Sequence, residues 1–255
     1  MTSRHIAIRR VSVSPEQLQG LPEFERNLLF LAGHVLNEIN ALNKAFIWSL
    51  GTSTGDDVSR LKGLAQGVQA LIFARVLAGK LFEAWEELKS SWSRNKLALR
   101  LAPSLHPIAA ESLTHLKKYF GKRNAIARIR NSVGFHYSAS ALGRTWRDAV
   151  GTGNYDCIFG GTISNNLNLS AEAVANAAML EIVGKSSVEE SLQSFFEEVQ
   201  GISEHMTTFL EGVTHLLLER ALGVSPLEAA ATDSVTTQFA FDEIHMPHFC
   251  APSEA

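Results

Sequence analysis

Apolar residues spaced three and four positions apart are the feature that most constrains the fold of this chain. Such spacing aligns side chains along one face of an α-helix, and that face must be buried against another element. The longest runs predict three long helices, over residues 22–48, 57–91 and 187–222. Shorter runs predict three more, over residues 109–120, 124–142 and 170–183. Helices of this length joined by short loops indicate an all-α fold, an antiparallel helical bundle.

A few stretches depart from the helical pattern. Residues 6–13 alternate loosely and predict a short strand or an ordered arm. Apolar residues on both sides of Gly160-Gly161 predict a small β-hairpin within residues 155–169. We find no internal repeat and place no boundary, so we expect a single helical domain over residues 1–255. From about residue 225 the chain is rich in Ala, Thr, Ser and Pro, which predicts a loosely packed C-terminal tail.

Composition and cysteine content indicate where such a chain works. With 45% hydrophobic and 19% charged residues, it has the composition of a globular protein. Residues 1–20 lack the apolar core of a signal peptide, and the apolar runs elsewhere are short for a membrane span. The two cysteines, Cys157 and Cys250, are isolated thiols, which are typical of a reducing compartment. His245, His248 and Cys250 cluster in the tail, but no second pair supplies a fourth zinc ligand. We therefore expect a cytoplasmic protein with no membrane partner, no metal site and no cofactor.

The net charge of −3 conceals an uneven distribution. Residues 88–147 contain 12 basic residues and one acidic residue, Glu111, whereas the rest of the chain has 11 basic and 25 acidic residues. A basic segment in an acidic protein has two interpretations. It forms a local anion-binding surface, for example for a nucleic-acid backbone, or its basic side chains pair with acidic helices within the fold.

The predicted helix over residues 124–142 contains the one motif with chemical character. Arg130 is followed directly by a polar residue, Asn131, and after five intervening residues by His136. This pattern resembles the signature of the HEPN superfamily, an Arg followed by a polar residue and, a few positions later, a His. The motif covers a small part of the chain, in a basic region of a helical protein. The resemblance implies a homodimeric, metal-independent endoribonuclease of the toxin or phage-defence kind. It further implies RNA as substrate, an antitoxin or regulatory protein as partner, and Arg130, Asn131 and His136 as catalytic residues.

These residue types suit RNA cleavage without a metal ion. A histidine can accept the proton of the 2′-hydroxyl or donate one to the leaving 5′ oxygen near neutral pH. An arginine is always charged, and its planar fork matches the phosphate that gains charge in the transition state. Asn131 would orient His136 or hold the sugar, and Tyr137 would hydrogen-bond a phosphate or stack on a base. Three basic residues complete the set as candidate substrate contacts: Lys122, Arg123 and Arg128.

A straight helix would not bring the three catalytic candidates together. At about 100° per residue, His136 lies about 240° from Arg130 and about 140° from Asn131. A bulge at Gly134 would add one residue to the turn and bring His136 close to the direction of Asn131. Alternatively, two chains related by a two-fold axis would share the site, which is the arrangement that the resemblance implies.

The sequence also permits a structural interpretation. Arg130 would then be a partly buried arginine paired with Glu38, and His136 a core histidine, in a non-catalytic helical protein that binds a partner or RNA. His34 and Glu38 lie one helical turn apart, a spacing that usually marks a contact on a helix surface. If their helix faces Arg130, the two would instead support the catalytic residues from behind.

Overall fold

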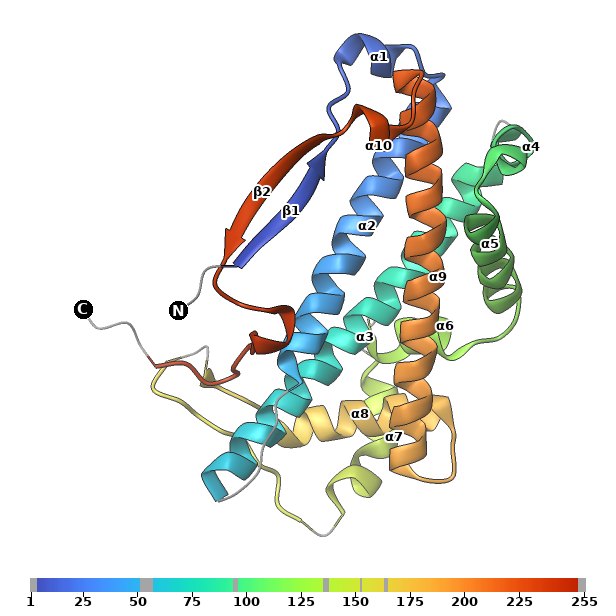
Figure 1. The fold of residues 1–255 in the computed structure, drawn as a ribbon. Helices are drawn as coiled ribbons and strands as arrows, with labels where there is room; N and C mark the ends of the chain where they lie inside the picture. Colours follow the sequence, from blue (N-terminus) through green and yellow to red (C-terminus); the bar gives the residue numbers. More distant parts are fainter. Residues whose placement is uncertain are drawn as a thin grey trace. The chain divides into compact units, whose positions relative to one another are not determined.

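The computed structural model describes residues 4–50, 57–93, 96–134, 138–151, 153–162 and 165–251, with the backbone alone at residues 57–59 and 242. Its helices (Figure 1) are α1 (Pro15–Gln19), α2 (Glu23–Ser49), α3 (Asp57–Ser93), α4 (Leu97–Leu101), α5 (Pro107–Phe120), α6 (Ala125–Ile129), α7 (Ala139–Val150), α8 (Leu169–Val183), α9 (Val188–Leu222) and α10 (Pro226–Ala229). Shorter turns of 3₁₀ helix cover Ala102–Ser104 and Phe241–Glu243, and a π-helical turn covers Arg130–Gly134. Strands β1 (Arg4–Arg10) and β2 (Ala231–Thr237) pair as a two-stranded sheet. The fold is therefore an all-α helical bundle, as the sequence predicts, and its small antiparallel sheet joins two segments other than the predicted hairpin.

The chain divides into two compact units. Unit 1 comprises residues 1–39, 83–122 and 202–244, and unit 2 comprises residues 40–82, 123–201 and 245–255. Each of α2, α3 and α9 contributes part of its length to unit 1 and the rest to unit 2. Because each unit consists of three separate stretches of chain, no single point in the sequence marks the division, which is consistent with the absence of a recognisable linker.

In unit 1, α3, α5 and α9 pack through aromatic and aliphatic side chains. Trp92 of α3 meets Phe209 of α9 edge to face, with ring centroids 5.3 Å apart. Gly212 of α9 faces Ala109 of α5, and a Cβ atom at Gly212 would lie 2.4 Å from the Cβ atom of Ala109. The glycine therefore permits a contact between α5 and α9 that any larger residue would prevent.

A buried carboxylate joins three helices of unit 1. Glu25 in the first turn of α2 is 1% exposed. Its Oε1 atom accepts hydrogen bonds from Nη2 of Arg100 at 2.7 Å and from Nη1 of Arg220 at 3.1 Å. These two arginines compensate the buried charge and attach α2 to α4 and α9.

The two-stranded sheet forms between segments far apart in the sequence. Strand β1 pairs with β2 in antiparallel register, from Arg4 opposite Thr237 to Arg10 opposite Ala231. The predicted hairpin within residues 155–169 is reduced to a single bridge between Ile158 and Leu167, with backbone hydrogen bonds of 2.7 and 2.9 Å. An asparagine side chain limits the ladder there, because the Gly160 N–H donates to Oδ1 of Asn166 instead of to a facing strand.

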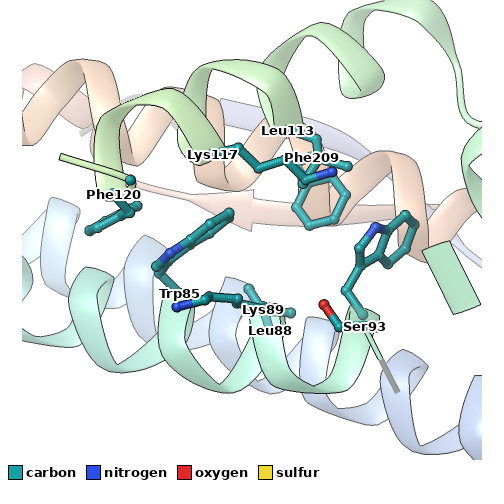
Figure 2. Close-up of a pocket in the computed structure, with 10 residues that line it drawn as sticks. Trp85, Leu88, Lys89, Ser93, Leu113, Lys117, Phe120 and Phe209 are labelled. Atoms are coloured by element: carbon teal, nitrogen blue, oxygen red, sulfur yellow. The ribbon is translucent and has the colours of Figure 1, made fainter. Parts of the chain in front are cut away.

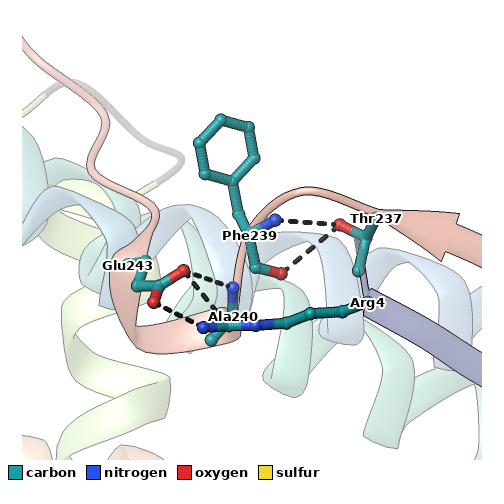
Figure 3. A network of polar contacts seen from close by, with 5 residues as sticks. All are labelled: Arg4, Thr237, Phe239, Ala240 and Glu243. Atoms are coloured by element: carbon teal, nitrogen blue, oxygen red, sulfur yellow. Dashed lines mark hydrogen bonds and ion pairs between the residues drawn. The ribbon is translucent and has the colours of Figure 1, made fainter. Parts of the chain in front are cut away.

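A network of polar contacts secures the end of the sheet (Figure 3). Arg4 donates two hydrogen bonds to the carboxylate of Glu243, at 3.0 and 2.8 Å. The same carboxylate accepts the backbone N–H of Ala240 at 2.8 Å. The Ala240 N–H, and after it the Arg4 guanidinium, lower the pKa of Glu243 below its usual value. Glu243 is therefore ionised, and the network complete, at neutral pH.

In unit 2, α3 and α8 meet at a buried ion pair. Arg75 of α3 has a side chain only 8% exposed and donates from Nη2 to the Glu172 carboxylate of α8. Its Nη1 atom donates to Oδ1 of Asn176, one turn further along α8, at 2.9 Å. The buried core of unit 2 is aliphatic and aromatic and includes Leu81, Ile126, Ile129, Met179 and Phe195.

Among the described residues, one helix has the length and composition of a membrane span, Arg60–Ser93 of α3. This finding differs from the expectation that the apolar runs are too short to span a membrane. It is a weak indication, because core helices meet the same criteria and 44% of the apolar window is buried within the protein. The same helix, α3, also carries Arg75, whose charge is paired with Glu172 inside unit 2.

Candidate functional site

The Arg130–Gly134 segment is a π-helical turn at the end of α6. Asn124 begins α6 by accepting the backbone N–H of Ala127 on its side chain at 2.8 Å. Ile126 and Ile129 then bury one face of α6 completely, and the turn widens directly after them. A π-helical turn holds one residue more than an α-helical turn and frequently occurs at functional sites. Of the two arrangements that the helical geometry left open, the bulge at Gly134 is thus present.

Gly134 shows why the turn can widen at this position. A Cβ atom there would lie 3.3 Å from the carbonyl oxygen of Ile129 and 3.4 Å from that of Arg75. Both neighbours are backbone atoms, which cannot rotate away as a side chain can. The glycine therefore allows the π-helical turn to approach α3 closely within unit 2.

Replacing Gly134 by alanine is expected to lower the free energy of unfolding by about 1–3 kcal/mol, the usual effect of overpacking. The matched control is Gly143→Ala on α7, where a Cβ atom would meet nothing within 4 Å. That substitution should stabilise the protein by about 0.5–1 kcal/mol, because alanine is the better helix former. Urea unfolding of the two variants measures both changes. Equal effects of the two substitutions would contradict a special role for Gly134.

Arg130 and Asn131 begin the turn on its accessible side. Arg130 is half-buried and Asn131 is exposed. The Nη1 atom of Arg130 donates to Oδ1 of Asn131 at 2.8 Å, and its guanidinium carbon lies 5.6 Å from the ring centroid of Phe82 on α3. The ring and the amide hold the guanidinium in one orientation while leaving it in contact with solvent. This placement suits a cation that must meet a phosphate.

His136 and Tyr137 lie outside the described residues, so their predicted roles are not tested by the geometry. The structure resumes at Ser138, which caps α7 by accepting the Ala141 N–H on its hydroxyl at 3.2 Å. The Ser138 N–H donates to the carbonyl oxygen of Ser132 at 3.3 Å. The prediction of one continuous helix over residues 124–142 is therefore wrong, because α6, the π-helical turn and α7 are separate elements. Serine favours the N-cap over the helix interior, which explains the new start at Ser138.

The remaining candidate residues are divided between the two units. Arg128 in unit 2 donates from Nη1 to the carbonyl oxygen of Ile182 at 2.8 Å, so it satisfies the end of α8. Arg123 is exposed in unit 2, and Lys122 is exposed in unit 1. The remaining candidates, His34 and Glu38, belong to unit 1. They form the expected contact along α2, with 3.9 Å between Nε2 of His34 and Oε2 of Glu38.

Two of the three residues clustered in the tail, His248 and Cys250, have other contacts. Nδ1 of His248 lies 3.3 Å from Oε1 of Gln69, while the Cys250 N–H donates to Oδ1 of Asn165 at 2.9 Å. In the part of the chain that the structure describes, no three His, Cys, Asp or Glu side chains are grouped as metal ligands. The 12 basic residues of the segment 88–147 also differ in their surroundings. Arg100 pairs with Glu25 and Lys89 with Glu86, so part of the basic segment serves ion pairs within the fold.

Two residues near the turn were not expected from the sequence. The backbone carbonyl oxygen of Arg75 faces Gly134. The ring of Phe82 lies beside the guanidinium of Arg130. Arg75 interrupts the apolar stripe of its helix, between Ile72 and Val76, and a charge within such a stripe is a signal that it is paired. The identity of its partner on α8 has no comparable signal.

Comparisons with known protein families, with curated proteins and with solved structures find no match to this chain.

Proposed function

We propose that this chain is a metal-independent endoribonuclease of the HEPN kind, a toxin or phage-defence effector, with Arg130, Asn131 and His136 as catalytic residues. The observation that carries the proposal is the π-helical turn over Arg130–Gly134. A straight helix would have separated the three side chains around its circumference. The wider turn supplies the one extra residue that would bring His136 close to the direction of Asn131, the residue next to Arg130.

The turn favours a catalytic role for Arg130 over a purely structural one. Arg130 is half-buried, its guanidinium is oriented by Phe82 and Asn131, and the planar fork of a guanidinium matches a phosphate. His136 would accept the 2′-hydroxyl proton or protonate the leaving 5′ oxygen, and Arg130 would stabilise the charged phosphorane. Arg123 and Tyr137 would contact the RNA, whereas Arg128 serves the end of α8.

We also propose that the protein works in the cytoplasm as a homodimer, with an antitoxin or regulatory protein as partner. Two-fold pairing would place two such turns in one assembly and extend the basic surface available to RNA.

The reaction itself provides the test of this function. Attack by the 2′-hydroxyl predicts cleavage of single-stranded RNA in the presence of EDTA, with 2′,3′-cyclic phosphate ends on the products. The matched substrate with 2′-deoxyribose at every position should stay intact, because it has no nucleophile. Products with other ends, or cleavage that EDTA abolishes, would exclude the proposed mechanism. RNA binding without any cleavage would favour the non-catalytic interaction protein.

A further inference from the structure

A cavity of about 190 Å³ lies in unit 1 among α3, α5 and α9 (Figure 2). Two aromatic pairs form much of its wall. Trp85 stacks on Phe120 with ring centroids 5.2 Å apart and an interplanar angle of 12°, and Trp92 meets Phe209 edge to face at 81°. Aromatic walls of this kind favour a flat, apolar ring as the occupant.

One polar group at the wall lacks a hydrogen-bond acceptor. Trp92 is 4% exposed and lines the cavity, and its Nε1 atom has no hydrogen-bond partner among the described residues. A buried indole N–H ordinarily donates to an acceptor, because leaving it unpaired is unfavourable. An oxygen atom of a molecule bound in the cavity would supply one.

The charges at the cavity have one sign. Lys89 and Lys117 line it, and no acidic side chain of the described residues does. Lys89 is engaged with Glu86, with 3.6 Å between Nζ and Oε1. Lys117 has no acidic partner in the described part of the chain, and Figure 2 shows it extending from α5 toward Phe209. The cavity therefore combines an apolar interior with an available ammonium group at its edge.

We propose that this cavity is a binding site for a small planar aromatic carboxylate. The ring would lie among the four aromatic side chains, a carboxylate oxygen would accept the Trp92 N–H, and Lys117 would pair with the charge. The volume sets the size of the ring system. An apolar cavity of roughly 150 Å³ holds benzene, so about 190 Å³ suits one ring or two fused rings. The inference concerns unit 1 and goes beyond the proposed cleavage of RNA, on which it does not depend.

Isothermal titration of the full chain tests the site, with indole-3-carboxylate as probe and neutral indole as its uncharged counterpart. The carboxylate should bind with a Kd of about 1 mM or lower. The Lys117→Met variant keeps the apolar stem and removes the charge, so it should weaken the carboxylate about fivefold and leave indole unchanged. Lys118→Met is the matched control, because Lys118 is the neighbouring exposed lysine and does not line the cavity. It should leave both affinities unchanged.

A second variant examines the buried donor. Trp92→Phe removes the N–H and should weaken indole-3-carboxylate about fivefold, with a smaller effect on indole, which has no oxygen acceptor. Lys117 is exposed, so its variant gives a result even if Trp92→Phe does not fold.

Three results would overturn the proposal. These are no binding of indole-3-carboxylate at about 10 mM, equal losses in Lys117→Met and Lys118→Met, and tighter binding of adenosine monophosphate than of the carboxylate. The last result would identify the occupant as a nucleotide.

Discussion

Replacing His136 by alanine is expected to reduce RNA cleavage about 10²–10⁴-fold, because the 2′-hydroxyl or the leaving oxygen loses its proton-transfer group. Replacing Arg130 by alanine is expected to reduce it about 10²–10³-fold, because the developing phosphorane charge loses its cation. Initial rates on a fluorescent single-stranded RNA measure both losses. Thermal unfolding followed by circular dichroism should show little change, since Arg130 is only half-buried.

Matched controls separate catalysis from the general charge of the protein. His245→Ala removes an exposed histidine from the tail, and Arg9→Ala removes an exposed arginine from β1, outside the basic segment. Both should leave cleavage unchanged. Arg130→Lys keeps the charge but loses the planar fork that contacts Asn131, so its rate should fall between those of the native protein and Arg130→Ala. Undiminished cleavage in both His136→Ala and Arg130→Ala would exclude the motif as the active site.

Replacing Glu172 by alanine is expected to lower the free energy of unfolding by about 3–5 kcal/mol. The reason is that Arg75, whose side chain is 8% exposed, would keep its charge with Asn176 as its neighbour and without a carboxylate. Equilibrium unfolding in urea measures the loss. Glu181→Ala on the same helix is the control, because Glu181 is exposed, and it should change the free energy by no more than about 0.5 kcal/mol.

A double variant tests whether the loss comes from the uncompensated charge. Arg75→Met combined with Glu172→Leu removes both charges and fills the space with apolar atoms. Such replacements of a buried ion pair are often neutral in stability, so the double variant should recover most of the loss. A double variant as unstable as Glu172→Ala would assign the effect to packing instead.

The long helices were predictable because their signal is local. The predicted range 187–222 matches α9 at Val188–Leu222, and the predicted range 22–48 matches α2 at Glu23–Ser49. Each of these helices carries a repeating apolar face, which defines both its type and its approximate ends. The apolar face alone does not identify the neighbouring helix, so the division into two units had no signal in the sequence.

The sheet and the break at Ser138 show where local reasoning ends. The pattern of residues 6–13 indicated a strand or arm, but a strand's period does not identify its partner, and β2 follows more than two hundred residues later. The glycine pair at 160–161 indicated a turn, and among the described residues the segments on either side of it meet at a single bridge. Ser138 lies within a helical pattern of the sequence, and that pattern did not indicate that its side chain caps a separate helix.

The candidate site was predictable in part. The spacing of Arg130 and His136, together with Gly134, left two alternatives, a bulge at Gly134 or a site shared by two chains, and the structure has a π-helical turn at Arg130–Gly134. The contact between Arg130 and Phe82 was not predictable, because it depends on how α3 meets the turn in three dimensions. The same holds for the pairing of Arg75 with Glu172, whose positions are far apart in the sequence.

The pairing of β1 with β2 has a consequence for the order of events during synthesis. The ribosome makes β1 before any of the long helices. Its partner strand β2, in which Ala231 pairs with Arg10, follows only after all of them. The seven residues of β1 therefore have no partner strand until more than two hundred further residues have been made. Joining the two strands is thus a late folding step with a high contact order, because the three long helices lie between the strands in the sequence.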